Sequence, residues 1–517
     1  MKRKKLIINA LILTIVTMSL GFINMGFRVY LSKKIGAEGM GLFQLIMSVY
    51  LMASTICISG IRVTTTRLIA EELGKSNSNN IKLIMKNAFV YSFFFSLLMF
   101  FIMYYGAEFI SNEWIKDERA IIPIKILACC MPSIGIGACF HGYFYGVRKV
   151  IKSISGDLIE SFTMMFIIIY FMSISLPKGL EYTCALICVG MSVGNIFCAV
   201  YFYILFLFEK KGKNNVSRNN TYNFPKIFSI SFPIACSSYI QMGLKTAEDI
   251  LIPTALRKFG TSSSSALTIF GIIKGMALPI LAFPSIFLAS FSTLIIPEIA
   301  EANALNNKAR VNYIISKVFK FTLLIAIFST GLFMIFSKEL GIGIYNNSQV
   351  GIMMKILAPL IPFMYLDRIV DGSLNALDKQ MDTLKFNLID MSIRIFLILY
   401  LIPKKGIEGF IIVLFAGTLL NSILSINKLL KVTKLEFLFI DWIIIPSICI
   451  SLSGFLIKTL LVNLNTNLVL LVLVNLFFYT IFLVLFKCIK KKDFMWFVDA
   501  FRYGFVCDDF YKIYKKI

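Results

Sequence analysis

The chain has 517 residues, of which 58% are hydrophobic and only 15% are charged, and its mean hydropathy is +0.81. A soluble protein of this length could not cover its surface with so few polar side chains, so the composition excludes a soluble globular fold and indicates a polytopic membrane protein. The net charge of +24 then indicates basic loops on the cytoplasmic face of a membrane, and no nucleic-acid partner.

Apolar runs long enough to cross a bilayer recur from end to end and predict an all-α fold of about 14 transmembrane helices. The N-terminal stretch "MKRKKLIINALILTIVTMSLGF" lacks a small-x-small cleavage site, so we interpret it as an uncleaved first span and not as a signal peptide. The predicted spans are 6–31, 41–61, 82–106, 121–146, 154–176, 181–208, 226–253, 266–295, 314–337, 350–377, 384–402, 407–428, 438–461 and 466–487.

Lysine and arginine are distributed unevenly over the predicted loops. Most of the 52 Lys and Arg residues fall at the two termini and in the connections that follow even-numbered spans. Because positive charge marks the cytoplasmic side, we expect both termini to be cytoplasmic.

A weak internal repeat relates the two halves at an offset of 230 residues. "ILACCMPSIGIGACFHG" from Ile126 matches "ILAPLIPFMYLDRIVDG" from Ile356, and Ile69-Ala70-Glu71 matches Ile299-Ala300-Glu301. The repeat predicts two six-helix lobes related by pseudo-twofold symmetry about the membrane normal, an arrangement used in alternating access. The predicted organisation is an N-lobe over 1–208, a cytoplasmic linker over 209–225, a C-lobe over 226–430, spans 13 and 14 within 431–489, and a cytoplasmic amphipathic tail over 490–517.

Signals for an enzyme are weak. "GMSVG" at Gly190–Gly194 has the spacing of a nucleophile elbow, but it lies in a predicted span, where small residues more often pack helices together. His141 is the only histidine, so a multi-histidine zinc site or a hydrolase triad is not easily built. A phosphate-binding G-x-x-x-x-G-K-[ST] loop is absent. The sequence therefore predicts a transporter without cofactor, driven by sodium or proton coupling, by the membrane potential or by the substrate gradient.

Charged residues within spans are the candidate functional residues, because a charge facing lipid at mid-bilayer costs about 3 kcal/mol. Arg28 and Lys274 lack an opposite charge within one helical turn, so they are the first candidates for contact with an anionic ligand. Asp390 and Arg394 are spaced i, i+4 and can neutralise each other. The remaining candidates are Lys125, His141, Glu160, Lys245, Glu248, Asp249, Asp367, Arg368 and Asp371.

Pro279 and Pro284 lie five residues apart in span 8. Prolines inside a helix remove backbone hydrogen bonds and kink it. We expect either a static curve or a hinge at this point.

The segment "GAEGMGLFQLIMSVYLMASTICISGIRVTTTRLIAEELGK", from Gly36 to Lys75, resembles the first hairpin of the stage V sporulation protein B family. This family belongs to the multidrug/oligosaccharidyl-lipid/polysaccharide exporter superfamily. The resemblance implies a monomeric flippase of the bacterial cytoplasmic membrane that moves undecaprenyl-pyrophosphate-linked saccharide by alternating access. A peptidoglycan precursor of the lipid II type, for spore cortex or cell wall, is the implied substrate.

The resemblance also implies roles for individual residues. By span position, Arg28, Arg62 and Lys274 form a cationic cavity for the pyrophosphate, and spans 13 and 14 form a groove for the lipid tail. The acids of span 7, Glu248 and Asp249, are expected to face the cavity with Lys245. A sodium site between spans 7 and 11 would use Asp249, Asn387 and Asp390, and no other metal site is expected.

Several alternatives stay open at this point. A multidrug/cation antiporter and an O-antigen or capsule-type polysaccharide flippase share the predicted architecture. A membrane scaffold without transport would tolerate neutralisation of Arg28 and Lys274. A membrane glycosyltransferase would need a carboxylate or metal constellation that the sequence does not offer.

Overall fold

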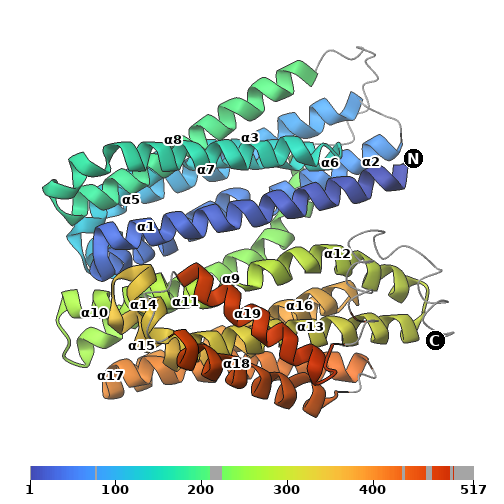
Figure 1. Cartoon of the computed structure of the whole chain (residues 1–517). Helices are drawn as coiled ribbons and strands as arrows, with labels where there is room; N and C mark the ends of the chain where they lie inside the picture. The colour runs from blue at the N-terminus through green and yellow to red at the C-terminus, as the bar shows by residue number, and fades with distance from the viewer. Residues whose placement is uncertain are drawn as a thin grey trace. The chain divides into compact units, whose positions relative to one another are not determined.

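A computed structural model describes residues 2–75, 79–209, 224–433, 437–461, 468–489 and 493, and every regular element within these ranges is a helix (Figure 1). In lipid the backbone must satisfy its own hydrogen bonds, which favours helices over open strands. Most of the predicted linker 209–225 and of the predicted tail 490–517 lies outside the described residues.

The structure divides into two compact units. The continuous unit spans Lys34–Gly271, and the discontinuous unit combines Met1–Lys33 with Ile272–Ile517. The units therefore group the first predicted span with the second half of the chain, and residues 226–271 with the first half. This grouping differs from the predicted lobe limits, which follow the sequence repeat and not the packing.

The continuous unit holds most of α1 and the helices up to α10. Three of its short elements are not α-helices: η1 is a π-helix, and η2 and η3 are 3-10 helices. The bounds are α1 (Lys2–Ile58), α2 (Ile61–Gly74), α3 (Asn79–Tyr105), α4 (Ala107–Phe109), η1 (Ile110–Ile115), η2 (Glu118–Ala120), α5 (Ile121–Cys129), α6 (Met131–Gly146), α7 (Val150–Ser175), η3 (Leu176–Lys178), α8 (Leu180–Glu209), α9 (Phe224–Lys258) and α10 (Ser263–Phe270).

The discontinuous unit holds the start of α1 and the later helices. Its η4 and η6 are π-helices, and η5 is a 3-10 helix. The bounds are η4 (Gly271–Ala277), α11 (Leu278–Ala282), α12 (Ser285–Ala304), α13 (Lys308–Ile335), α14 (Ser337–Tyr345), α15 (Ser348–Leu357), η5 (Ala358–Leu360), α16 (Ile361–Ala376), α17 (Gln380–Val432), η6 (Ile440–Ile444), α18 (Ile445–Leu461) and α19 (Leu468–Leu485).

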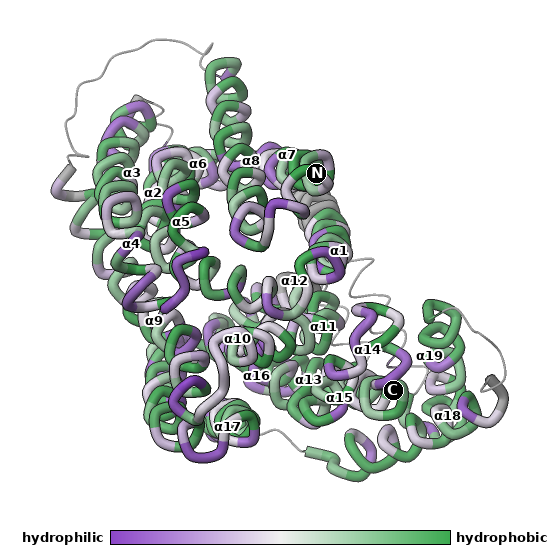
Figure 2. The backbone as a smooth tube through the Cα atoms, turned by 90° about the vertical axis from the view of Figure 1, so that its left-hand side faces the viewer, coloured by the Kyte–Doolittle hydropathy of each residue, from purple (hydrophilic) through white to green (hydrophobic). Residues whose placement is uncertain are grey.

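Eleven described helices are long and apolar enough to cross a membrane, or twelve if the bent pair α5–α6 counts as one span. Of the eleven, Gln380–Val432 contains two predicted spans, and Thr14–Gly74 contains one and most of another. Figure 2 shows hydrophobic residues along most helices and hydrophilic stretches mainly at turns. The chain is thus a multi-pass, all-helical membrane protein as predicted, and the number of 14 spans stays a prediction.

Glycines break the two longest helices. Gly36 in α1 has φ 69° and ψ −175°, and Gly406 in α17 has φ 57° and ψ −126°. Residues other than glycine rarely adopt such positive φ angles. The break at Gly36 lies close to Lys33–Lys34, where the chain passes from one unit to the other.

The 230-residue repeat is visible in local structure. α6 (Met131–Gly146) and α16 (Ile361–Ala376) have matching bounds at this offset. Left-handed residues also recur: Lys116 and Asn346 have φ 59° and 52°, and Arg148 and Asp378 both have φ 60°. The sequence matches at this offset therefore correspond to a succession of helices and turns that occurs in both halves of the chain.

Each unit has its own packed interior. In the continuous unit, buried residues of α2, α3, α6 and α8 form one cluster that includes Tyr91, Phe140 and Phe202. In the discontinuous unit, α18 and α19 pack on α13 through Leu324, Ile450 and Tyr479. Of the helices in these clusters, α2 carries the candidate Arg62 and α6 carries His141.

Candidate functional site

Arg28 and Lys274 meet at the π-helix η4 in the discontinuous unit. Arg28 Nε donates to the carbonyl oxygen of Gly275 at 3.0 Å, and its Nη2 donates to the carbonyl oxygen of Lys274 at 3.4 Å. Tyr345 donates to the next carbonyl, that of Met276, at 3.1 Å. A π-helix disturbs the regular hydrogen-bond ladder, and side chains here supply donors to three successive carbonyls. The guanidinium of Arg28 is thereby held against the backbone of Lys274, 246 positions away.

Lys274 also lines a polar pocket of about 300 Å³ in the same unit. Its polar wall consists of Lys274, Asp367, Arg394, Thr418 and Asn421, and its apolar wall of Leu278, Leu360, Met364 and Leu414. Asn421 Nδ2 donates to both carboxylate oxygens of Asp367 at 3.0 and 2.9 Å. The volume is at the lower end for ligand pockets, so the space suits a small ion or part of a larger headgroup.

Asp390 and Arg394 form an ion pair, one of the two roles that the sequence suggested for them. Arg394 Nε lies 2.8 Å from Asp390 Oδ2, and Arg394 Nη2 donates to Thr418 Oγ1 at 3.4 Å. Asp390 is only 6% exposed. The pair aims the guanidinium at the pocket, while a coupling role for Asp390 and the half-buried Asn387 stays a prediction.

The span 7 acids lie in the continuous unit, on α9. Asp249 Oδ2 accepts a hydrogen bond from Ser48 at 2.9 Å, and Thr246 donates to the carbonyl of Ser48 at 3.1 Å. Glu248 and Asp249 are 6% and 4% exposed, whereas Lys245 is exposed. The helix therefore turns the acids and the lysine toward different surroundings. A sodium site shared by Asp249 with residues of the other unit stays a prediction.

Arg62 belongs to α2 in the continuous unit and lies over the ring of Tyr145, with its guanidinium carbon 5.2 Å from the ring centroid. Such a cation–π contact stabilises a half-buried guanidinium. Arg62 is thus placed by packing between α2 and α6, and its proposed contact with substrate stays a prediction.

Both prolines of span 8 lie at breaks in the helix. Pro279 is in the first turn of α11, and Pro284 precedes α12 after a short turn. Pro279 thus lies where the π-helix η4 gives way to α11, and Pro284 lies between α11 and α12; proline lacks a backbone N–H donor and is tolerated at such helix starts. The curve or hinge expected at these prolines stays a prediction.

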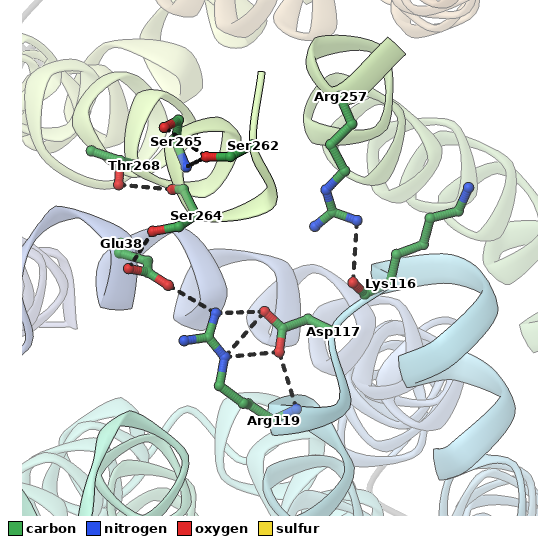
Figure 3. Close-up of polar contacts among 9 residues, drawn as sticks. All are labelled: Glu38, Lys116, Asp117, Arg119, Arg257, Ser262, Ser264, Ser265 and Thr268. Atoms are coloured by element: carbon green, nitrogen blue, oxygen red, sulfur yellow. Dashed lines mark hydrogen bonds and ion pairs between the residues drawn. The ribbon is translucent and has the colours of Figure 1, made fainter. Parts of the chain in front are cut away.

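Sequence reasoning missed a polar network at one end of the continuous unit (Figure 3). Glu38 accepts hydrogen bonds from Arg119 Nη2 at 2.9 Å and from Ser264 Oγ at 2.6 Å. Asp117 holds the same guanidinium at 2.7 Å, and Arg257 donates to the carbonyl of Lys116 at 3.2 Å. Through these bonds, Glu38 connects the part of α1 after Gly36 with Arg119 in η2 and with Ser264 at the start of α10. These residues lie in predicted loops, where charged side chains are common and therefore do not indicate a site.

His141 has two polar neighbours on α7. Its Nδ1 lies 2.6 Å from Ser153 Oγ, and its Nε2 lies 3.3 Å from Asp157 Oδ1. These residue types form hydrolase triads, and the i, i+4 spacing of Ser153 and Asp157 could have indicated the contact. Ser153 is fully buried, so a substrate cannot reach its hydroxyl. The contact therefore packs α6 against α7.

Comparison with known proteins supports the predicted family resemblance independently of the site geometry. The model of the polysaccharide biosynthesis protein family matches residues 6–255. Stage V sporulation protein B of Bacillus subtilis (strain 168) is 24% identical over 428 residues, covering 81% of this chain and 82% of that protein.

Solved structures share the fold. Lipid II flippase MurJ in an inward closed conformation matches with a TM-score of 0.68 and 16% identity, covering 92% of this chain and 98% of MurJ. An inward-facing multidrug resistance MATE family transporter of the MOP superfamily matches with a TM-score of 0.58 and 12% identity, covering 80% and 96%. The chain therefore shares its fold with these two proteins.

These matches confirm the resemblance predicted from the sequence: over residues 6–255 the chain is similar to the polysaccharide biosynthesis protein family, and over most of its length it is similar to stage V sporulation protein B.

Proposed function

We propose that this protein is a flippase that moves a lipid-linked saccharide across the cytoplasmic membrane, with both termini on the cytoplasmic side. The substrate is an undecaprenyl-pyrophosphate-linked peptidoglycan precursor of the lipid II type. The names of the sporulation protein and of the lipid II flippase among its relatives support this proposal. The structural observation that carries it is the meeting of Arg28 and Lys274 at η4.

The chemistry of these residues suits a pyrophosphate. Charged side chains within spans face protein or water because lipid cannot solvate them. A guanidinium offers several donors in a fixed fork, and an ammonium is a compact point charge; both bind phosphate oxygens. Lys274 and Arg394 line one pocket. Arg28 holds the backbone beside Lys274, so an anion bound there would contact a pre-arranged cationic surface.

The working mechanism is alternating access. The headgroup binds to the cationic residues while the polyprenyl chain stays in lipid, and the protein then exposes the headgroup on the other side. The helix breaks at Gly36, η4 and Pro284 supply points where the backbone can bend. A potential negative inside favours return of an emptied cationic site, by about 2.3 kcal/mol per charge per 100 mV.

Reconstitution tests the substrate. Purified protein in proteoliposomes should translocate fluorescent lipid II, and protein-free liposomes should not. The same assay with an undecaprenyl-linked glycan of the O-antigen type would show whether the protein discriminates between the two saccharides. Failure to translocate any lipid-linked saccharide would contradict the proposal.

A cation antiporter is the second candidate, and the half-buried Asp367 in the pocket is the observation that favours it. Efflux of a cationic dye from the same vesicles, driven by a sodium or proton gradient, would support this candidate. Dye efflux without lipid II translocation would replace the flippase proposal.

A further inference from the structure

An apolar groove of about 760 Å³ lies between α3, α6 and α8 of the continuous unit. Its floor contains Phe140 and Phe206, which are 1% and 8% exposed, while Val90, Phe94 and Tyr203 at its rim are 50%, 60% and 52% exposed. The other lining residues are Phe89, Phe93, Leu97 and Ile136. α3 and α8 are candidate membrane spans, and α6 belongs to the bent pair that together could form another, so we infer that the groove opens toward the lipid.

The walls of the groove are fixed by contacts between aromatic rings. The ring of Phe140 lies 5.1 Å from that of Phe89, 5.5 Å from that of Phe206 and 6.5 Å from that of Tyr203. Rigid rings that pack against one another keep the space open. Water is a poor occupant, since the Tyr203 hydroxyl is the only polar side-chain group in the lining. A hydrocarbon is the chemistry that fits.

The internal repeat shows what covers the corresponding face in the other half. At the 230-residue offset, Phe94 and Leu97 correspond to Leu324 and Ile327 of α13, which are 4% and 6% exposed. There α18 and α19 cover the face, and Tyr479 donates to the carbonyl of Leu324 at 3.0 Å. Phe94 is 60% exposed, so the described part of the chain leaves the equivalent face of α3 accessible.

Basic residues lie at one end of the groove. Lys82 and Lys86 precede Val90 on α3 at intervals of four residues, so they share its face of the helix, and both are exposed. On the opposite wall, α8 ends at Glu209, which accepts hydrogen bonds from Lys149 at 2.9 Å and Lys152 at 2.7 Å. Lys82 and Lys86 lie near the start of the span Asn80–Tyr105, and Glu209 lies at the end of the span Leu180–Glu209, so we infer that this end of the groove is at the level of the lipid headgroups.

The groove has the depth of one leaflet. From Phe89 to Leu97 the helix rises about 12 Å, against about 15 Å for half the hydrocarbon core of a bilayer. We propose that the groove binds one acyl chain of an anionic glycerophospholipid from the leaflet beside Lys82 and Lys86, and that these lysines hold its phosphate. A polyprenyl chain would extend well beyond this depth. The site is separate from the proposed transport site and does not depend on it.

Tryptophan quenching tests the occupant. Phe94→Trp places a fluorophore at the rim, and Phe166→Trp places one on α7 at a position that is 70% exposed and outside the groove. Each variant is reconstituted with phospholipids brominated on the acyl chain, and the signal of the three native tryptophans is subtracted. We expect brominated phosphatidylglycerol to quench Phe94→Trp more than brominated phosphatidylcholine at equal mole fraction. Phe166→Trp should be quenched equally by both.

The lysines and the groove volume are then varied in the Phe94→Trp background. Lys82→Gln with Lys86→Gln should weaken the apparent affinity for phosphatidylglycerol by about tenfold or more. The exposed pair Lys338→Gln with Lys355→Gln, on α14 and α15, is the matched control and should change nothing. Ile136→Phe, which adds a ring to the groove, should also reduce the selective quenching.

Three results would overturn the proposal. Equal quenching of Phe94→Trp by both lipids would show ordinary contact with bulk lipid. Weaker quenching at Phe94 than at Phe166 by both lipids would show that a protein helix or a second copy covers the face. Displacement of the brominated lipid by undecaprenyl phosphate would assign the groove to the polyprenyl chain.

Discussion

Arg28 Nε donates a hydrogen bond to the carbonyl oxygen of Gly275 at 3.0 Å, and so connects the first helix to the π-helix of a span 247 residues later. The contact gives Arg28 a structural role besides its charge. Loss of a hydrogen bond from a charged donor costs about 2 kcal/mol. Arg28→Met should therefore lower the thermal unfolding temperature of detergent-purified protein.

Arg67→Met is the control for this prediction. Arg67 pairs with Glu71 at 2.8 Å, but its side chain is 67% exposed, and exposed pairs contribute about 0–1 kcal/mol. Equal unfolding temperatures for the two variants would contradict the structural role of Arg28.

The ion pair between Asp390 and Arg394 predicts strong coupling in a double-mutant cycle. Asp390→Asn or Arg394→Gln alone leaves a largely buried charge without its partner and should cost about 3–5 kcal/mol. The double variant should cost much less than the sum, because both charges are gone. Unfolding free energies of the four proteins measure the coupling. Additive effects would show that the two side chains do not depend on each other.

Gly417 provides a way to disturb that pair without changing either charge. A Cβ atom at Gly417 would lie 2.2 Å from Arg394 Nε, so alanine must displace the guanidinium. In the Gly417→Ala background, the coupling between residues 390 and 394 should fall by at least half. Gly26→Ala is the matched control, since a Cβ there meets nothing within 4 Å. Undiminished coupling in Gly417→Ala would contradict the observed packing.

Asp493 predicts a pH dependence of stability. Burial raises the pKa of this carboxyl, but hydrogen bonds from Lys317 and Lys320 outweigh burial and hold the pKa below its usual value of 3.8. A carboxyl with a lowered folded pKa adds stability that is complete above 3.8 and is lost as pH falls through the folded value. Asp493→Asn should lower the unfolding temperature at neutral pH, and the difference from wild type should shrink below 3.8. A difference that is constant with pH would exclude this role.

The helical membrane fold was predictable because hydropathy is a local property of the chain. A run of apolar residues needs a helix in lipid whatever it packs against. The repeat was also readable, since Pro132 and Pro362 recur at the same place near the start of α6 and α16. The two compact units were not predictable, because they depend on long-range packing that places the first 33 residues with the second half of the chain.

The candidate site was predictable only in part. The cost of burying charge singled out Arg28 and Lys274, and the structure brings them together. The contact of Asp367 with Asn421 was missed because 54 residues separate them and no local spacing relates them. Glu38 and Arg119 were missed because they lie outside the predicted spans, where charged residues are ordinary.

The central claim is that Arg28 and Lys274 recognise the pyrophosphate of a lipid-linked saccharide. The most direct measurement is the rate of lipid II translocation in proteoliposomes by wild type, Arg28→Ala, Lys274→Ala and the exposed control Lys355→Ala. We predict that both site variants lose about tenfold or more of the rate, as expected when a charged contact to substrate worth about 1.4 kcal/mol or more is lost, while the control matches wild type. Wild-type rates in both site variants would contradict the assignment of these residues to the substrate.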